Sequence, residues 1–443
     1  MRHLAALVLI GTATTLASAQ APRYDILITG GRVIDGTGTP ARIADIAVKD
    51  GRVAAIGRLL RAAAAETIDA ADLIVAPGFI DVHTHADDLA DRPRAENFVR
   101  MGVTSIVAGN CGSSALDVGE ALTRIREVGA SVNFATLIGH NTVRRAAMGT
   151  ANRPPEPSEL AKMKSLVWRA MTDGAVGLST GLQYVPGTYA GTPEIIELTR
   201  VAAEAGGLYA SHMRNEGTAL EESVRETIQV GEAARCPVQI SHLKVDSPSR
   251  WGASAQALAI IDAARARGVK VVADQYAYTA ASSTLGIRLP SWALEGGQER
   301  IAERLNDPPT WARIKREMHA LLAERGLRDL SFAVVASHSA DPVLNGLTMK
   351  QVAMKRTGSD SADAQFEAAR EMLLAGGASM VYHFMSDADV ERIMRHPHVG
   401  IASDSSVLAF GEGVPHPRGY GNNARVLGEY VRKRKILSVE EAV

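Results

Sequence analysis

Eight short apolar runs, separated by helix-like segments, constrain the fold more than any other feature of this 443-residue chain. The runs span residues 74–85, 103–111, 134–140, 175–181, 208–214, 238–244, 269–278 and 399–405. The segments between them, such as 220–234 and 253–267, are rich in Ala and have helical apolar spacing. Near-continuous apolar strands are typical of a parallel sheet that is covered on both faces. Eight such units predict an α/β fold, a closed, TIM-like (β/α)₈ barrel.

The interval between the seventh and eighth runs is too long for a simple barrel connection. About 120 residues separate these runs, whereas loops in α/β units usually have about 2–6 residues. Residues 282–345 contain Gly296-Gly297 and Pro308-Pro309, followed by helical stretches. We therefore expect residues 282–345 to form a lid-like insertion over the barrel mouth, before the last barrel strand.

Residues 20–72 predict the N-terminal part of a small β domain. Two segments, 25–35 and 44–57, alternate short β-branched runs with Gly and Asp turns, and Asp50-Gly51 is a strong hairpin signal. These strands are too few to bury a core of their own. Residues 73–443 are assigned to the barrel and its insertion.

The first 19 residues predict a signal peptide. Arg2 and His3 precede an apolar run that ends near Leu16, and residues 17–19 (Ala-Ser-Ala) form an A-x-A cleavage pattern. The run is shorter than the roughly 20 apolar residues that span a bilayer. We expect a secreted or periplasmic protein whose mature form has no membrane segment; the alternative is a frayed N-terminal helix.

Composition excludes several classes of function. The chain has 48 Lys and Arg against 49 Asp and Glu, and no block of like charge stands out. Nucleic acid is therefore not expected as a partner, because binding it requires a clustered basic face. With two cysteines, Cys111 and Cys236, the fold is not built on a disulfide framework. In an exported protein, a single disulfide between them is an alternative to two free thiols.

Two histidines, His83 and His85, lie at the end of the first run. Side chains two residues apart on a strand face the same side, so the two imidazoles can share a metal ion. The H-x-H pattern alone is a weak signal. A second pair, His396 and His398, precedes the eighth run, at the end of the barrel opposite the usual chemistry, and we interpret it as a surface pair.

Ligand-type side chains recur at the carboxyl ends of other runs, namely Cys111, His212, His242 and Asp404. Barrel active sites are built at that rim from several strand ends. Independent structural roles would not select the same rim for all of these residues. The set therefore predicts a metal-dependent active site.

Six sequence strings are specific in combination: they begin at Gly78 (GFIDVHTH), Gly109 (GNCG), Gly177 (GLSTGLQYVPG), Ser211 (SHMRNE), Ile240 (ISHLK) and Ala402 (ASD). Together they resemble the D-aminoacylases, the N-acyl-D-amino-acid deacylases of the amidohydrolase superfamily. The resemblance covers nearly everything from Tyr24 to the last residue.

The resemblance implies that two sets of residues bind metal. A tightly bound Zn²⁺ is held in that family by the residues matching Cys111, His212 and His242. A second, weaker metal position is formed by those matching His83, His85 and Asp404. The cysteine takes the place of the carboxylated lysine of many superfamily members.

Amide hydrolysis at neutral pH needs such a site, because an amide is a poor electrophile and water is a poor nucleophile. Metal coordination lowers the pKa of water from about 15.7 to about 7 and polarises the carbonyl. We expect Asp404 to take a proton from the attacking water and to deliver it to the departing amine. The alternative is that Asp404 caps a turn among its neighbouring serines.

A free α-carboxylate on the substrate requires a cation. Lys244 follows the histidine of the sixth run by two residues, and Arg418 stands in the string HPRGYG, which resembles the family's carboxylate-binding motif. A guanidinium fork suits a planar carboxylate. The resemblance also implies contacts from Tyr276 and Ser282, with Tyr278 as an alternative to Tyr276.

These residues predict zinc-dependent hydrolysis of N-acyl-D-amino acids to a carboxylate and a free D-amino acid. A D-residue-specific dipeptidase of the same superfamily is an alternative, because both substrates place an amide beside a carboxylate. The expected partner is thus a small molecule, an N-acyl-D-amino acid or a D-dipeptide. The sequence does not predict an oligomeric state.

A further alternative is a truncated remnant that binds metal without catalysis. The chain stops at Val443, within what reads as the last barrel helix. Family members continue with strands that complete the small β-sandwich domain, so we expect that domain to be incomplete here.

Overall fold

A computed structural model of the chain describes residues 23–59 and 63–443. The predicted signal peptide, residues 1–19, lies outside the described residues. Contacts along the chain define two units that separate after Pro77, and the larger unit spans Gly78–Ala442. Of the helices in the described part, none has the length and apolar character needed to cross a bilayer.

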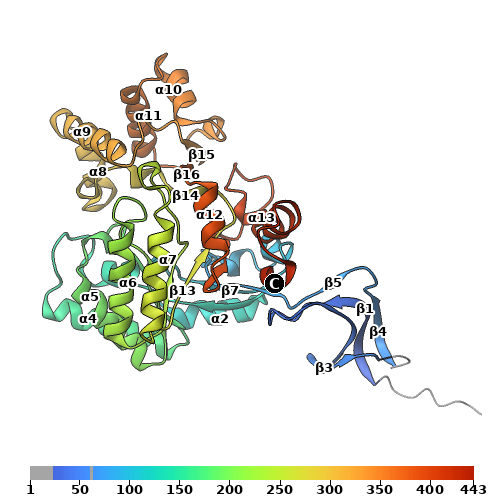
Figure 1. Cartoon of the computed structure of the whole chain (residues 1–443). Helices are drawn as coiled ribbons and strands as arrows, with labels where there is room; N and C mark the ends of the chain where they lie inside the picture. Colours follow the sequence, from blue (N-terminus) through green and yellow to red (C-terminus); the bar gives the residue numbers. More distant parts are fainter. Residues whose placement is uncertain (1–22, 60–62) are drawn as a thin grey trace, which may run out of the picture. The chain divides into compact units, whose positions relative to one another are not determined.

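The larger unit contains the predicted parallel barrel (Figure 1). Its strands are β6 (Phe79–Asp81), β7 (Val103–Ala108), β8 (Asn133–Thr136) with its continuation β9 (Ile138–Gly139), β10 (Gly177–Gly181), β11 (Leu208–His212), β12 (Val238–Ile240), β13 (Val271–Gln275) and β17 (Val399–Ile401). The pairs within each sheet are parallel. Each of the eight predicted runs thus contains one barrel strand.

Backbone contacts close this barrel at two places outside the regular ladders. Leu137 donates to the carbonyl of Ala108, which joins β7 to the β8–β9 strand. Thr84 and Ser405 form an isolated parallel bridge, and the His85 amide donates to Ser405 O at 2.8 Å. The residues that follow the first and last strands are therefore neighbours.

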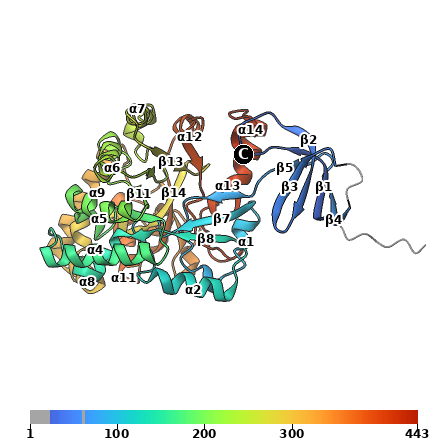
Figure 2. The same ribbon diagram turned by 90° about the horizontal axis from the view of Figure 1, so that it is seen from below.

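Helices alternate with the strands, and α4 to α7 lie side by side outside them (Figures 1 and 2). The helices of the barrel are α1 (Glu96–Val99), α2 (Val118–Val128), α3 (His140–Met148), α4 (Pro157–Thr172), α5 (Thr192–Glu204), α6 (Leu220–Ala234), α7 (Ser254–Ala266), α12 (Asp387–Met394), α13 (Arg418–Arg425) and α14 (Val439–Ala442). Single turns are η1 (Leu89–Asp91), η2 (Gly187–Tyr189) and η3 (Pro248–Arg250), and η7 (Val426–Lys433) is π-helical.

The helical apolar spacing seen in the sequence corresponds to the faces that pack on the sheet. Val224 and Ile228 of α6 and Ile261 of α7 are buried together with Val238 and Ile240 of β12. Burial of each such side chain contributes about 1.5–3 kcal/mol. This packing makes the barrel a rigid frame for the loops at its rim.

The insertion between β13 and β17 is larger than predicted. Its antiparallel sheet has the order β14 (Ala280–Thr284), β16 (Ser379–His383), β15 (Ala333–Ser337), and its helices are η4 (Leu285–Arg288), η5 (Ser291–Leu294), α8 (Gly297–Asn306), α9 (Pro308–Glu324), η6 (Pro342–Leu344), α10 (Met349–Thr357) and α11 (Ala362–Leu374). The predicted end at residue 345 is wrong, because the central strand β16 lies beyond it. The insertion has its own core, which includes Trp311, Phe366 and Tyr382.

The smaller unit contains one five-stranded sheet. Its order is β3 (Arg52–Gly57), β2 (Arg42–Lys49), β1 (Tyr24–Val33), β4 (Ala64–Asp69), and β5 (Ile74–Val75) also pairs with β1. Asp50 and Gly51 join β2 to β3 with φ of 52° and 70°, as the hairpin signal predicts.

The boundary between the small β domain and the barrel was predicted between residues 72 and 73, but it lies after Pro77. Ile74 and Val75 pair with Arg32 and Val33 of β1, so the first apolar run is split between the two units. Residues 73–77 therefore lie with the small sheet and not with the barrel. Pro77 follows this strand pair, and the barrel strand begins at Phe79.

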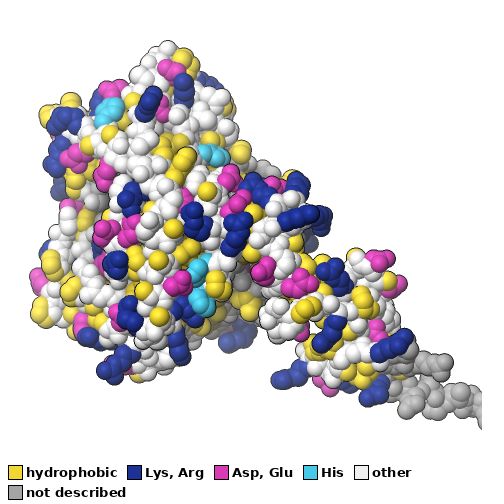
Figure 3. Space-filling view, viewed as in Figure 1, with side chains coloured by type: hydrophobic (Ala, Val, Ile, Leu, Met, Phe, Trp, Pro, Cys, Tyr) yellow, Lys and Arg dark blue, Asp and Glu magenta, His cyan; other side chains and the backbone are white. Residues whose placement is uncertain are grey.

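Charged side chains of both signs are interspersed on the face shown in Figure 3. The pattern agrees with the formal net charge of −1.

Candidate metal centre

The six predicted ligands converge at one end of the barrel. His83 and His85 follow β6, Cys111 follows β7, His212 ends β11, His242 follows β12 and Asp404 follows β17. The ring centroids of His83 and His242 lie 4.9 Å apart, and those of His212 and His242 lie 4.4 Å apart. Side chains from five strands thus meet in one place.

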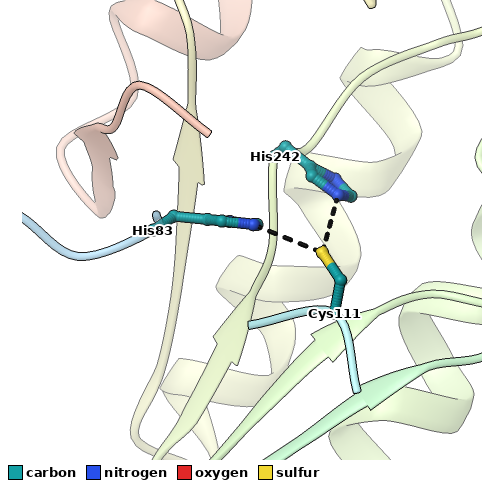
Figure 4. Close-up of side chains that lie close together, drawn as sticks. All are labelled: His83, Cys111 and His242. Atoms are coloured by element: carbon teal, nitrogen blue, oxygen red, sulfur yellow. Dashed lines mark hydrogen bonds between the residues drawn. The ribbon is translucent and has the colours of Figure 1, made fainter. Parts of the chain in front are cut away.

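Cys111 lies between two imidazoles (Figure 4). Its Sγ is 3.3 Å from Nε2 of His83 and 3.5 Å from Nε2 of His242. These three donor atoms are within coordination reach of one another. The structure therefore groups Cys111 with His83 and His242, whereas the resemblance implied His212 as the third member.

Two further groups of donor atoms adjoin this one. His83, His85 and Asp404 form the first, with Asp404 Oδ1 at 3.0 Å from His85 Nε2 and 3.5 Å from His83 Nε2. His212, Glu216 and His242 form the second. Both ring nitrogens of His212 are buried and have no hydrogen-bond partner among the described residues. Buried imidazoles without partners beside a thiol fit a metal-binding site.

Three of the predicted ligands have left-handed backbone conformations, with φ of 53° at Cys111, 36° at His242 and 51° at Asp404. Such conformations cost about 1–3 kcal/mol for residues other than glycine, and they cluster at functional sites. Each occurs just after a strand ends. The turn directs the side chain inward, and hydrogen bonds such as Asp404 N to His83 O (2.9 Å) hold it there.

Two buried carboxylates that the sequence analysis missed orient the histidines. Asp274 Oδ1 is 3.0 Å from His83 Nδ1 and accepts from the backbone amide of His242 at 2.8 Å. Asp81 accepts from the amides of His83 and Ser403. Since Nδ1 of His83 faces Asp274, its Nε2 faces the Cys111 sulfur, an arrangement typical of metal-binding histidines. Asp81 is the last residue of β6 and Asp274 the second-to-last residue of β13, and this position at the carboxyl end of a barrel strand is the signal that could have identified them.

Glu216 is a further buried carboxylate that the analysis missed. Its Oε1 accepts from Lys244 Nζ at 2.6 Å and lies 2.8 Å from His242 Nδ1. Burial alone would raise the pKa of Glu216, but Lys244 and His242 hold it well below its usual value. Glu216 therefore fixes both the sixth-strand histidine and the predicted cation.

Burial and neighbouring charges act in opposite directions on the pKa values of the predicted ligands. Burial raises the pKa of the Cys111 thiol, but the imidazoles of His83 and His242 lower it well below the usual value. Burial lowers the pKa of His85, and contacts with Asp404 and Cys111 raise it to about 10. A thiolate is the form that binds metal. The cluster thus holds Cys111 in its metal-binding form.

The predicted carboxylate-binding residues lie beside the metal cluster. Arg418 Nη1 is 2.8 Å from Asp404 Oδ2, and the Arg418 guanidinium lies 4.6 Å from the centre of the Tyr276 ring. Lys244 Nζ lies 5.9 Å from the same ring. Burial raises the pKa of Asp404, but Arg418 and His83 hold it well below its usual value. Both predicted cations are therefore already paired with buried carboxylates.

A cavity of about 670 Å³ connects the cluster with the insertion. From the barrel it is lined by Cys111, His242, Lys244, Tyr276, Asp404 and Arg418, and from the insertion by Ser282, Arg288 and Tyr382. Tyr278 is not part of this lining, so the geometry favours Tyr276 over Tyr278 as the residue beside the site. Ser282 is half-buried on β14.

The remaining sulfur and histidine candidates lie elsewhere. Cys111 and Cys236 are both buried and free, so the disulfide alternative is wrong. His396 and His398 are absent from the cavity lining, and His396 Nε2 contacts Asp262 of α7 at 3.1 Å.

Comparisons with known proteins agree with this geometry. The model of the amidohydrolase family matches residues 66–443. An N-acyl-D-glutamate deacylase from Alcaligenes xylosoxydans xylosoxydans is 36% identical in an alignment of 445 positions that covers 95% of this chain and 81% of that protein.

Two solved structures are similar along nearly the whole chain. The N-acyl-D-glutamate deacylase of Bordetella bronchiseptica, complexed with zinc and a phosphonate inhibitor, matches with a TM-score of 0.79 at 34% identity. A D-aminoacylase whose binuclear metal centre is described by one-metal activation and second-metal attenuation matches with a TM-score of 0.78 at 32% identity. Each match covers 95% of this chain and 83% of the solved one.

These matches span the barrel, the insertion and every strand that carries a candidate ligand. The chain belongs to the amidohydrolase family, in its D-aminoacylase (N-acyl-D-amino-acid deacylase) group.

Proposed function

We propose that this protein is a zinc-dependent hydrolase that cleaves the amide bond of N-acyl-D-amino acids to a carboxylate and a free D-amino acid. The observation that carries the proposal is the Cys111 sulfur between His83 Nε2 and His242 Nε2, in a cavity whose wall also contains Lys244 and Arg418. The relatives named above, which act on N-acyl-D-glutamate or are D-aminoacylases, support the same class of substrate.

The donor atoms fit Zn²⁺, which prefers thiolate sulfur and imidazole nitrogen. Cys111, His83, His212 and His242 would hold the tight ion. His85 and Asp404, with His83 shared, would hold a second, weaker one, as the binuclear centre of the related D-aminoacylase supports. When bound, Zn²⁺ polarises the scissile carbonyl and lowers the pKa of a water molecule.

Asp404 carries the proton in this proposal. Its carboxylate borders the cavity beside His85 and Arg418, and the low pKa keeps it ionised, which is the form that accepts a proton. After accepting a proton from the attacking water, Asp404 delivers it to the nitrogen of the departing amine. One group thus serves as base and then as acid.

Lys244 and Arg418 bind the α-carboxylate without breaking their ion pairs. An ammonium has three donors and a guanidinium has five, so contacts with Glu216 and Asp404 leave donors for the substrate. Tyr276 and Ser282 extend the same wall and complete the contacts with this carboxylate.

We also infer that the protein is exported, on the basis of the A-x-A pattern at residues 17–19. In a bacterial host, the mature periplasmic form should begin at Gln20. N-terminal sequencing checks this, and an uncleaved cytoplasmic product would contradict it.

A substrate panel tests the function. The purified chain, loaded with zinc, should hydrolyse N-acetyl-D-amino acids at least about 10²-fold faster than the L-enantiomers, because the cavity fixes the carboxylate and amide of one enantiomer. Faster cleavage of L-Xaa-D-Xaa dipeptides would indicate a dipeptidase. Bound zinc with no turnover of any D-substrate would indicate a non-catalytic remnant.

A further inference from the structure

His416 lines the cavity but takes no part in the proposed chemistry. Both of its ring nitrogens are engaged with backbone groups: Nε2 donates to the Ala280 carbonyl at 2.9 Å, and Nδ1 accepts from the Arg418 amide at 3.0 Å. Because a carbonyl accepts and an amide donates, these contacts define the neutral tautomer with its proton on Nε2. Burial and the charge of Arg418 lower the pKa of His416 to about 3. The ring therefore has no donor or acceptor left for a substrate or for proton transfer.

The two hydrogen bonds of His416 join the two elements that carry predicted carboxylate ligands. Arg418 is the first residue of α13, and its amide is one of the helix-start amides that have no partner within the helix. Ala280 is the first residue of β14, and Ser282, two residues along the same strand, lines the cavity. His416 thus connects the helix that carries the guanidinium with the strand that carries the hydroxyl.

The position of His416 is itself fixed. It lies between Pro415 and Pro417, and proline restricts both its own φ and the conformation of the residue before it. The imidazole packs edge-to-face on Tyr278, with 5.1 Å between the ring centroids, and its centroid lies 5.9 Å from that of Tyr276. A residue that positions other groups must be held in this way by its own surroundings.

The helix α13 has a further anchor that does not depend on His416. Asn422, one turn after Arg418, is fully buried. It accepts from the Ala277 amide at 2.8 Å and donates to the Ala402 carbonyl at 3.0 Å. These contacts tie the helix to the segments that follow β13 and β17. Replacement of His416 should therefore release the first turn of α13 and its link to β14, while the helix stays on the barrel.

We infer that His416 is a positioning residue for the α-carboxylate site: its imidazole holds α13 and β14 at the separation at which the Arg418 guanidinium and the Ser282 hydroxyl contact one carboxylate. The inference rests on the proposed function and adds to it a residue that does not touch the substrate. Donors that are held in place before binding lower the ordering cost of binding, and a displacement of about 1 Å can cost about 10²-fold in rate.

A matched pair of substrates tests this inference. N-acetyl-D-methionine and its α-carboxamide, N-acetyl-D-methioninamide, differ only at the α-carboxylate. Values of kcat/KM are measured for both with the zinc-loaded full chain. The unmodified enzyme should favour the carboxylate by about 10–100-fold, the range expected for hydrogen bonds to a charged group. In His416→Ala this preference should fall below about threefold through a rise in KM for the carboxylate, while kcat/KM for the carboxamide changes less than about threefold.

Two conservative variants separate the hydrogen bonds of His416. In His416→Asn the side-chain carbonyl can replace Nδ1, and in His416→Gln the side-chain amide can replace Nε2, so each keeps one of the two contacts. Each variant should retain part of the preference that His416→Ala loses.

His383→Ala is the matched control. It removes an exposed histidine that pairs with Ala280 across the β14–β16 ladder, and it should leave the preference intact. Equal losses on both substrates in His416→Ala would mean that His416 supports only the fold, and would overturn the inference.

Calorimetric binding of the same two compounds separates the inference from the proposed function. Turnover with a preference for the carboxylate that His416→Ala leaves unchanged would overturn the inference alone. If the zinc-loaded enzyme turned over no substrate, the proposed function would fail. Selective binding of N-acetyl-D-methionine that His416→Ala abolishes, at unchanged zinc content, would then still support the inference. Equal or absent binding of the two compounds by the unmodified protein would overturn it.

Discussion

At the Cys111 thiol, burial and charge act on the pKa in opposite directions. Burial raises it, and the surrounding imidazoles of His83 and His242 lower it further than burial raises it. Cys236 shows the reverse case, because burial raises the pKa of that thiol to about 11. The same side chain is therefore a thiolate suited to bind metal at position 111 and a protonated thiol at position 236.

Replacing Cys111 with Ala should abolish tight zinc binding. Loss of a thiolate ligand should weaken zinc by more than the roughly 10–100-fold that loss of an outer partner costs. Elemental analysis of dialysed protein measures the effect. Cys236→Ala removes the other buried thiol and should retain its zinc. Equal zinc contents in the two variants would contradict the ligand role of Cys111.

Asp404→Asn should separate metal binding from catalysis. The amide keeps the shape of the carboxylate but cannot carry a proton, so turnover should fall by about 10²–10⁴-fold. Zinc on the tight site (Cys111, His83, His212 and His242) should be largely retained, as shown by elemental analysis of the same sample. Near-normal turnover would remove Asp404 from the proton transfer.

The sequence predicted which side chains converge at the barrel rim better than it predicted the residues around them. His83, Cys111 and Asp404 could be found because each follows an apolar run at the same rim. Asp274 and Glu216 occur at similar positions, but whether a carboxylate binds metal or orients a histidine depends on distances that a sequence does not contain.

At the scale of strands and helices, apolar runs predicted the barrel but not the extent of the insertion. Helices α10 and α11 have apolar faces with the spacing of barrel helices, so a sequence pattern does not separate the two. What identifies this region as an insertion is the antiparallel pairing of β16 with β14 and β15, which the sequence does not reveal. Likewise, the sequence of Ile74–Val75 resembles the start of a barrel strand, but its pairing with β1 places it in the small sheet.

A buried ion pair joins two helices next to the barrel. Glu194 of α5 lies 2.9 Å from His140 Nε2 and 2.5 Å from Arg144 Nη1, both of α3. Burial raises the pKa of Glu194, but the hydrogen bond with His140 and the charge of Arg144 lower it below its usual value. A lowered folded pKa gives stability that is present above the unfolded pKa and is lost as the pH falls through the folded pKa.

Glu194→Gln should therefore destabilise the protein by about 3–5 kcal/mol at pH 7, since it leaves Arg144 buried without its carboxylate. The difference from the unmodified protein should begin to shrink as the pH falls below about 4.3, the pKa of Glu in an unfolded chain, and should be lost once the pH falls through the lower folded pKa of Glu194. Urea unfolding at both pH values measures it. Glu197→Gln, on the exposed side of α5, should cost at most about 1 kcal/mol. Equal effects of the two substitutions would contradict this account.

For the whole molecule, metal binding should couple to stability because the ligands come from five separate barrel strands. Zinc at about 100 times its dissociation constant stabilises the folded state by about 2.7 kcal/mol. Removal of the metal with a chelator should lower Tm by about 3 °C and abolish hydrolysis. Scanning calorimetry measures the shift. The Cys111→Ala variant should show no shift with chelator, and an unchanged Tm in the unmodified protein would contradict the coupling.

The central claim is that a thiolate and imidazoles from different strands hold one zinc ion in the cavity. X-ray absorption at the zinc edge, on protein loaded with one equivalent of zinc, tests it most directly. The account predicts one sulfur at about 2.3 Å from zinc together with nitrogen at about 2.0–2.1 Å. A shell of nitrogen and oxygen alone, without sulfur, would contradict it.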